Sequence, residues 1–124
     1  MQTGASYIYV LQENIMESRF VRSECEDRRE RFEETGGGCY TGCVYLSYQE
    51  MVQLFGEPLN FDDDKTECEW FIDDLESEKY APLFSVYDYK GESNPWHIGS
   101  KGSIDFKGFA RFLSEKLGKK VHVN

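Results

Sequence analysis

Three short runs rich in aromatic and β-branched residues most constrain the fold of this 124-residue chain. They span 66–73, 83–90 and 96–99, and polar or turn-forming links, including Gly91–Pro95, separate them. Strand-forming runs that alternate with such links are typical of a small antiparallel sheet. The middle run is apolar at both odd and even positions, which predicts a strand in the centre of the sheet.

The outer two runs predict strands with one face in the core. Residues 66–73 alternate between Cys68, Trp70 and Ile72 on one side and mostly acidic residues on the other. We therefore expect a half-buried strand whose solvent side carries one ring, Phe71. In the last run, Trp96 and Ile98 share one face and His97 lies on the other.

Two helices are predicted from capping residues and apolar periodicity. Ser47 and Glu50 form a capping box, and Gly56 and Pro58 end the helix, which gives a helix over 47–56. Apolar residues recur at helical spacing from Phe106, which gives a second helix over 103–117 with Ser103 as its cap. Residues 121–123 are either a frayed tail or a last edge strand.

The N-terminal third carries weaker signals. Residues 6–11 and 39–46 are plausible strands, and 22–34 is a charged segment that predicts a solvated helix. The residues just before that segment fit either a strand or a helix. A chain of this length without an internal linker is expected to form a single domain, 1–124. The fold class predicted is α+β: a mainly antiparallel sheet of four to five strands, helices 47–56 and 103–117 packed on one face, and a charged N-terminal helix at the periphery.

Charge is concentrated in one segment. Residues 57–78 hold ten acidic residues against one lysine, a net charge of −9 that equals the net charge of the whole chain. Such a surface repels phosphate, which disfavours direct nucleic-acid binding, and attracts a basic protein surface. The predicted binding residues on this acidic face are Asp62, Asp63, Asp64, Glu67 and Glu69.

The sequence lacks the common motifs for binding zinc, calcium and phosphate. Cys39 and Cys43 have the wrong spacing for a zinc knuckle, and the acidic run from Asp62 lacks the glycine and distant glutamate of a calcium loop. The glycines at 36–38 are not followed by a P-loop lysine. We therefore expect no metal and no cofactor. No apolar run is long enough for a membrane span and no signal peptide is visible, so a cytoplasmic protein without a membrane partner is expected.

Catalytic groups are sparse. A cysteine–histidine site would depend on His97, and no motif supports one. Asp88 is more informative, because a carboxylate in a strand among aromatic rings needs a partner. Lys90, Lys101 and His97 are the nearest sequence candidates. The group is either a structural ion pair or a small pocket formed by Asp88, Lys90, Trp96, His97 and Lys101.

The same stretch carries a resemblance. It lies in the residues from Lys65 to Trp70, from Tyr87 to Lys90 and from Trp96 to Gly99. A helix that ends in Leu-Phe-Gly-Glu-Pro at 54–58 precedes them. Together these segments resemble small uncharacterised α+β proteins of tailed phages and large DNA viruses. The resemblance covers about residues 46–101 and departs from the pattern by a longer insertion at 74–79. It implies a viral origin, but the family has no activity that carries over.

The function predicted is a non-enzymatic, acidic protein-binding module, virus-encoded, which occupies a basic surface of a host or viral protein as an inhibitor. One alternative is a structural, virion-associated protein that self-assembles into homo-oligomers. The other is a small-ligand binder or enzyme that uses the group around Asp88 and His97.

Overall fold

The structure is a computed structural model that describes residues 18–24, 40–60 and 66–124. Its elements, in chain order, are β1 (Phe20–Arg22), β2 (Tyr40–Val44), α3 (Tyr48–Phe55), β3 (Leu59–Asn60), β4 (Cys68–Asp74), β5 (Leu83–Tyr89), β6 (Glu92–Ser100) and α4 (Phe106–Leu117). The α+β class predicted from the sequence is confirmed.

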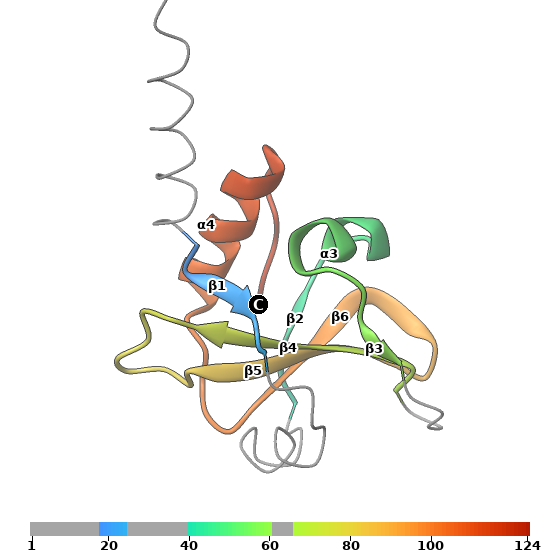
Figure 1. Ribbon diagram of the computed structural model, residues 1–124, viewed down its shortest axis with the longest axis horizontal. Helices are drawn as coiled ribbons and strands as arrows, with labels where there is room; N and C mark the ends of the chain where they lie inside the picture. The colour runs from blue at the N-terminus through green and yellow to red at the C-terminus, as the bar shows by residue number, and fades with distance from the viewer. Residues whose placement is uncertain (1–17, 25–39, 61–65) are drawn as a thin grey trace, which may run out of the picture.

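The strands form one antiparallel sheet in the order β1-β4-β5-β6-β2, and the short β3 also pairs with β4. The sheet thus has six strands rather than the four to five predicted. Strand β5 is central, as its two-sided apolar pattern predicted. Both described helices lie on the same side of the sheet (Figure 1).

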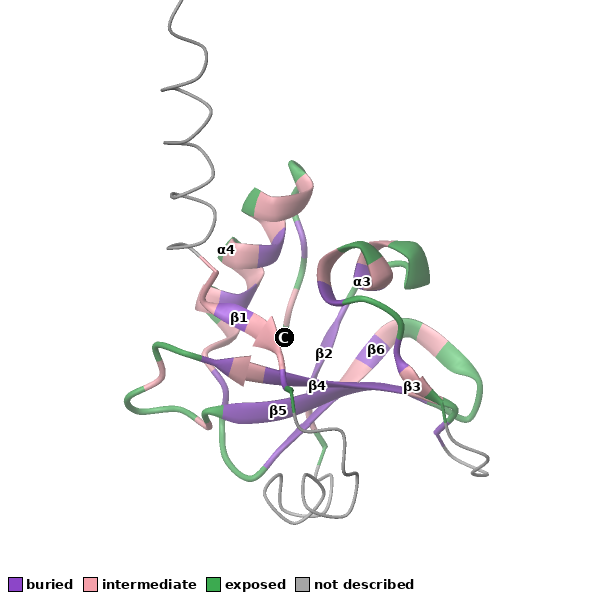
Figure 2. Ribbon diagram, in the orientation of Figure 1, coloured by how far each residue is buried: buried purple, intermediate pink, exposed green. Residues whose placement is uncertain are grey.

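The hydrophobic core lies between this sheet and the two helices (Figure 2). Side chains at alternate positions of the central strands meet the apolar stripes of α3 and α4. Trp70 and Trp96 contact each other edge to face, with ring centroids 5.0 Å apart, and Phe84 contacts Phe109 in the same way. The fully buried large side chains are Trp70, Trp96, Phe84, Phe109, Met51, Ile72, Ile98, Ile104, Leu113, Val44 and Val86.

Helix α3 forms as predicted. The Ser47 hydroxyl accepts the Glu50 N–H at 3.1 Å, and the Glu50 carboxylate accepts the Ser47 N–H at 2.9 Å. Gly56 follows the helix with φ of +80°, a conformation that favours glycine. Local hydrogen bonds therefore fix both ends of this helix.

Helix α4 begins later than predicted, and Asp105 rather than Ser103 is its cap. The Asp105 carboxylate accepts the Gly108 N–H at 3.0 Å and also accepts a hydrogen bond from Arg19 at 3.1 Å. Arg19 in turn binds both oxygens of Asp74, at 2.8 and 2.9 Å. Because Asp105 joins the helix to β1 and β4, it is the better cap in the folded chain.

Two strand predictions need correction. Strand β4 is not half-exposed, since Phe71 is only 3% exposed and Glu69 8%. The predicted turn Gly91–Pro95 is smaller: Lys90 and Gly91, both with positive φ, form a two-residue turn, and β6 already begins at Glu92. A two-residue turn with positive φ at both positions matches the twist of a β-hairpin.

The N-terminal predictions are only partly covered by the described residues. Phe20–Arg22 form strand β1, so the charged helix predicted over 22–34 does not begin at 22, and its remainder from residue 25 lies outside the described residues. The predicted strand 6–11 also lies outside them. The predicted strand 39–46 is confirmed as β2. At the other terminus, Val123 forms an antiparallel bridge with Val44 at the edge of the sheet.

Candidate functional site

One end of the sheet brings together the acidic segment and the turn of the β5–β6 hairpin. Strands β3 and β4 pair through Asn60 and Cys68, so residues 61–67 connect them at this end. The turn between β5 and β6 lies at the same end. Tyr87, close to this turn, pairs with Glu69 near the start of β4, and it pairs with His97 on its other side. We call residues 61–67 the acidic connection; Figure 1 shows β3 and its neighbours at this end.

Of the five predicted acidic binding residues, two are described. Glu67 is exposed and lies at the base of the acidic connection. Glu69 is 8% exposed and lies opposite Tyr87 in the sheet, so its carboxylate is not part of an exposed acidic face. Asp62, Asp63 and Asp64 lie outside the described residues.

Asp88 holds the base of the acidic connection. It is 5% exposed, and its Oδ1 accepts the backbone N–H groups of Glu67 at 2.8 Å and Cys68 at 2.9 Å. A carboxylate that accepts two N–H donors is stabilised without a cation. Among the described residues, the groups that donate hydrogen bonds to Asp88 are therefore these backbone N–H groups, rather than the Lys90, Lys101 or His97 side chains that the sequence suggested.

The predicted pocket around Asp88 and His97 is not one site. Trp96 is 1% exposed in the core, where its indole N–H donates to the Leu46 carbonyl at 2.8 Å. His97 is its neighbour in β6 and lies on the opposite face of the sheet. Lys90 is in the hairpin turn, whereas Lys101 follows the far end of β6. These side chains do not converge, because Trp96 and His97 point to opposite faces and Lys90 and Lys101 flank opposite ends of β6.

His97 instead belongs to a cluster of rings on the face opposite the helices. Its ring centroid lies 5.0 Å from that of Tyr40, 5.6 Å from Tyr87 and 5.2 Å from Tyr89, which stacks on it nearly in parallel. We call Tyr40, Tyr87, Tyr89 and His97 the tyrosine–histidine surface. Tyr40 is 60% exposed and Tyr89 is 36% exposed.

A hydrogen bond and burial raise the pKa values of two tyrosines of this surface. The Tyr40 hydroxyl lies 3.1 Å from Cys43 Sγ, and this hydrogen bond raises the pKa of Tyr40. Burial raises the pKa of Tyr87 to about 12, with a smaller contribution from the neighbouring Glu69 carboxylate. Both phenols are therefore neutral at ordinary pH.

No single pattern in the sequence predicts this surface. Tyr87 and Tyr89 have the i, i+2 spacing that places two strand residues on one face, so this pair of rings could have been predicted from the sequence. Tyr40 comes from β2, far away in the sequence, and only the pairing of β2 with β6 brings it to His97.

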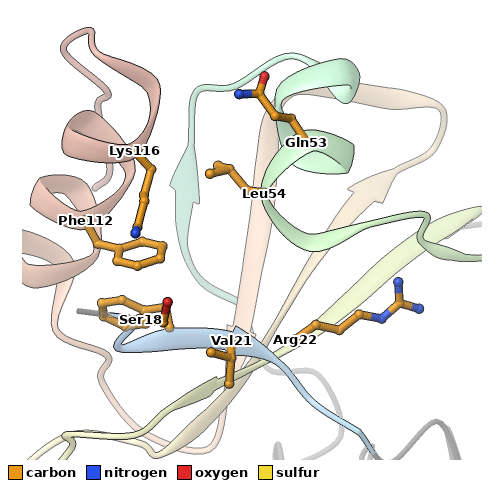
Figure 3. A pocket seen from close by; sticks show the side chains of 8 residues that line it. Ser18, Val21, Arg22, Gln53, Leu54, Phe112 and Lys116 are labelled. Atoms are coloured by element: carbon orange, nitrogen blue, oxygen red, sulfur yellow. The ribbon is translucent and has the colours of Figure 1, made fainter. Parts of the chain in front are cut away.

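A groove with a volume of about 380 Å³ lies between α3, α4 and β1 (Figure 3). Phe112 and Leu54 point into it from the two helices, and Lys116 reaches over the Phe112 ring. Its lining residues are Ser18, Phe20, Val21, Arg22, Gln53, Leu54, Phe112 and Lys116. Polar and apolar side chains line the groove about equally, and its described lining includes no carboxylate, histidine or cysteine.

The described residues also show how metal-binding and thiol groups are placed. No three histidine, cysteine, aspartate or glutamate side chains there are grouped so that they could bind a metal ion. Cys43 and Cys68 are free thiols. Burial, with the charges of Asp88 and Glu67, raises the pKa of Cys68, so its nucleophilic thiolate is disfavoured.

No helix among the described residues has the length and apolar character needed to span a membrane. Comparisons of this chain with protein-family models, with curated proteins and with solved structures find no match.

Proposed function

We propose that this protein is a non-enzymatic protein-binding module that uses its acidic connection to engage a basic surface of another protein. The observation that carries the proposal is the buried Asp88 carboxylate, which holds the N–H groups of Glu67 and Cys68. Asp88 thus holds the end of the acidic connection that leads into β4. The sequence of this connection has four acidic residues, Asp62, Asp63, Asp64 and Glu67, and one basic residue, Lys65. The charge of Glu67, whose backbone Asp88 holds, meets a partner at a smaller entropic cost than a charge on a free chain.

The neighbouring residues add to the negative potential at this end of the sheet. Glu57 precedes β3, is exposed, and accepts a hydrogen bond from the Tyr48 hydroxyl at 3.1 Å. Long-range attraction between such a surface and a basic partner accelerates association and weakens with added salt. The resemblance to phage and large-virus proteins favours a virus-encoded inhibitor whose target is a basic, nucleic-acid-binding groove.

The proposal is tested with a hexalysine peptide as the basic partner. One variant neutralises the acidic connection (D62N, D63N, D64N and E67Q), and a matched control neutralises four other acidic residues (E24Q, E76Q, E78Q and E115Q). Calorimetry should show that the first variant binds the peptide about tenfold more weakly at low salt than the control does. Equal losses in the two variants, or no binding by the unmodified protein, would overturn the proposal.

The alternative of a self-assembling virion component is tested separately. Sedimentation of the unmodified protein in high salt, where charge repulsion is screened, reports its oligomeric state. A stable oligomer there would favour the structural alternative over a binding module.

A further inference from the structure

The tyrosine–histidine surface lies on the face of the sheet opposite the helices, and through Tyr89 it reaches the end of the sheet where Glu67 lies. Tyr89 is the last residue of β5 before the hairpin turn. Its neighbour in the strand, Asp88, accepts the Glu67 N–H, so Tyr89 and Glu67 lie at the same end of the sheet. A partner bound to the acidic connection would therefore come within reach of these rings.

The rings of this surface are held in place by one another. His97 stacks on Tyr89 with an interplanar angle of 12° and meets Tyr40 and Tyr87 edge to face. The contact of the Tyr40 hydroxyl with Cys43 fixes the outermost ring. Aromatic side chains that are ordered before binding lose little conformational entropy when a partner arrives.

The exposed rings are suited to cations. The face of a tyrosine ring carries negative electrostatic potential and attracts ammonium and guanidinium groups. The chain itself provides an example, since Lys90 Nζ lies 5.4 Å from the centroid of the Tyr89 ring. Phosphate would meet no comparable attraction in a chain with a net charge of −9, which argues against a nucleic-acid partner.

We propose that the tyrosine–histidine surface receives arginine side chains of a basic protein partner, whose guanidinium groups stack on Tyr40 and Tyr89. This inference rests on the proposed function and names the side chain that the partner must carry. Arginine fits better than lysine because its planar guanidinium stacks on an aromatic ring and is more weakly hydrated than an ammonium group. The negative charge of the acidic connection complements the same partner.

The experiment compares hexaarginine and hexalysine peptides, which carry equal charge. The unmodified protein should bind hexaarginine about fivefold or more tightly, which corresponds to about 1 kcal/mol of stacking. A variant with Y40L and Y89L keeps apolar bulk and should lose that preference, because its affinity falls more for hexaarginine than for hexalysine. The control is Y45L with Y80L, because Tyr45 and Tyr80 are 42% and 41% exposed and lie outside the surface.

Each outcome separates this inference from the proposed function. Equal binding of the two peptides by the unmodified protein, or an arginine preference that survives in Y40L/Y89L, overturns the inference and leaves the proposed function standing. Loss of hexalysine binding in the acidic-connection variant supports the proposed function alone. Ring-proton shifts of Tyr40, Tyr89 and His97 on addition of hexaarginine, absent with hexalysine, would support the stacking directly.

Discussion

Asp88 shows how backbone N–H groups satisfy a buried carboxylate in this protein. Its carboxylate is 5% exposed and accepts two backbone N–H groups from the start of β4. The same hydrogen bonds attach Asp88 to the acidic connection, because the Glu67 N–H is one of the two donors. Substitution of this side chain therefore tests both stability and the anchoring of the proposed site.

We expect Asp88→Ala to lower the free energy of unfolding by about 2–3 kcal/mol, because two partly buried N–H groups lose their charged acceptor. Asp88→Asn keeps an acceptor oxygen and should cost about 1 kcal/mol. Urea denaturation measures both values. Glu92→Ala is the control: it removes an exposed carboxylate at the same end of the sheet and should change stability by less than about 0.5 kcal/mol. Equal losses in Asp88→Ala and the control would contradict the role given to Asp88.

Tyr87 gives a pH-dependent prediction. Its pKa of about 12 in the folded protein exceeds the value of about 10 expected in the unfolded chain. Between these values the folded state holds its proton more tightly, so stability falls as the pH rises from about 10 to 12 and does not change for this reason below that range.

The measurement is tyrosinate absorbance during an alkaline titration, combined with denaturation at each pH. Tyr87→Phe should remove the component that titrates near 12 and flatten the loss of stability in that range. Tyr80→Phe, which changes an exposed tyrosine, should leave both unaltered. If the stability profile of Tyr87→Phe matches that of the unmodified protein, burial of the Tyr87 phenol does not control it.

At the scale of elements, Arg19 joins three separate pieces of secondary structure. It precedes β1, forms a two-point ion pair with Asp74 at the end of β4, and bonds Asp105 at the start of α4. The Asp74 side chain is 1% exposed and that of Arg19 is 22% exposed. Gly108 lies so close that a Cβ there would come within 2.6 Å of the Arg19 guanidinium. The contact therefore fixes how α4 sits against the edge of the sheet.

Because Asp74 is buried, we expect Asp74→Ala to cost about 3 kcal/mol of stability. A double-mutant cycle with Arg19→Ala should give a coupling of about 1–3 kcal/mol, and Arg19→Lys should not replace the two-point contact. The pair of Lys119 and Glu50, 2.5 Å apart, is the control. Its side chains are 51% and 21% exposed, so neither charge is as buried as that of Asp74, and the coupling should be about 0.5 kcal/mol or less. Similar couplings for the two pairs would show that burial does not strengthen the Arg19–Asp74 contact.

At the scale of the whole molecule, short segments cover both edges of the long strands. Strands β1 and β3 pair with different parts of β4, while residues 121–124 pair with β2 at the other edge. The Tyr45 N–H donates to the His122 carbonyl at 3.0 Å, and Cys43 and Asn124 exchange two backbone hydrogen bonds. Covered edges protect a sheet from pairing with other chains.

Removal of residues 121–124 should therefore lower the melting temperature and promote self-association through the uncovered edge of β2. Part of the loss comes from Val121, which is 4% exposed. Gly42→Ala gives an independent route to the same effect, because a Cβ at this position would lie 2.6 Å from the Asn124 carbonyl oxygen. Thermal melts and sedimentation at several protein concentrations test both variants. A truncated protein that stays monomeric and equally stable would show that the terminal segment does not protect the edge.

The sequence by itself determined the elements that local interactions specify. The capping box of α3 depends on Ser47 and Glu50, three residues apart, and the apolar stripe of α4 repeats within a few turns. The central place of β5 followed from apolar residues at both phases of the strand. These signals are readable because hydrogen bonds and periodic burial act between residues close in the chain.

Only the tertiary structure decided which residues meet across strands. The pairing of β2 with β6 brings Tyr40 to His97, and β1 brings Arg19 to Asp105, so that Asp105 rather than Ser103 caps α4. The predicted group of Asp88, Trp96 and His97 separated for the same reason: strand register and the alternation of faces assign each side chain its surroundings. Register depends on contacts between residues far apart in the chain, which no local pattern contains.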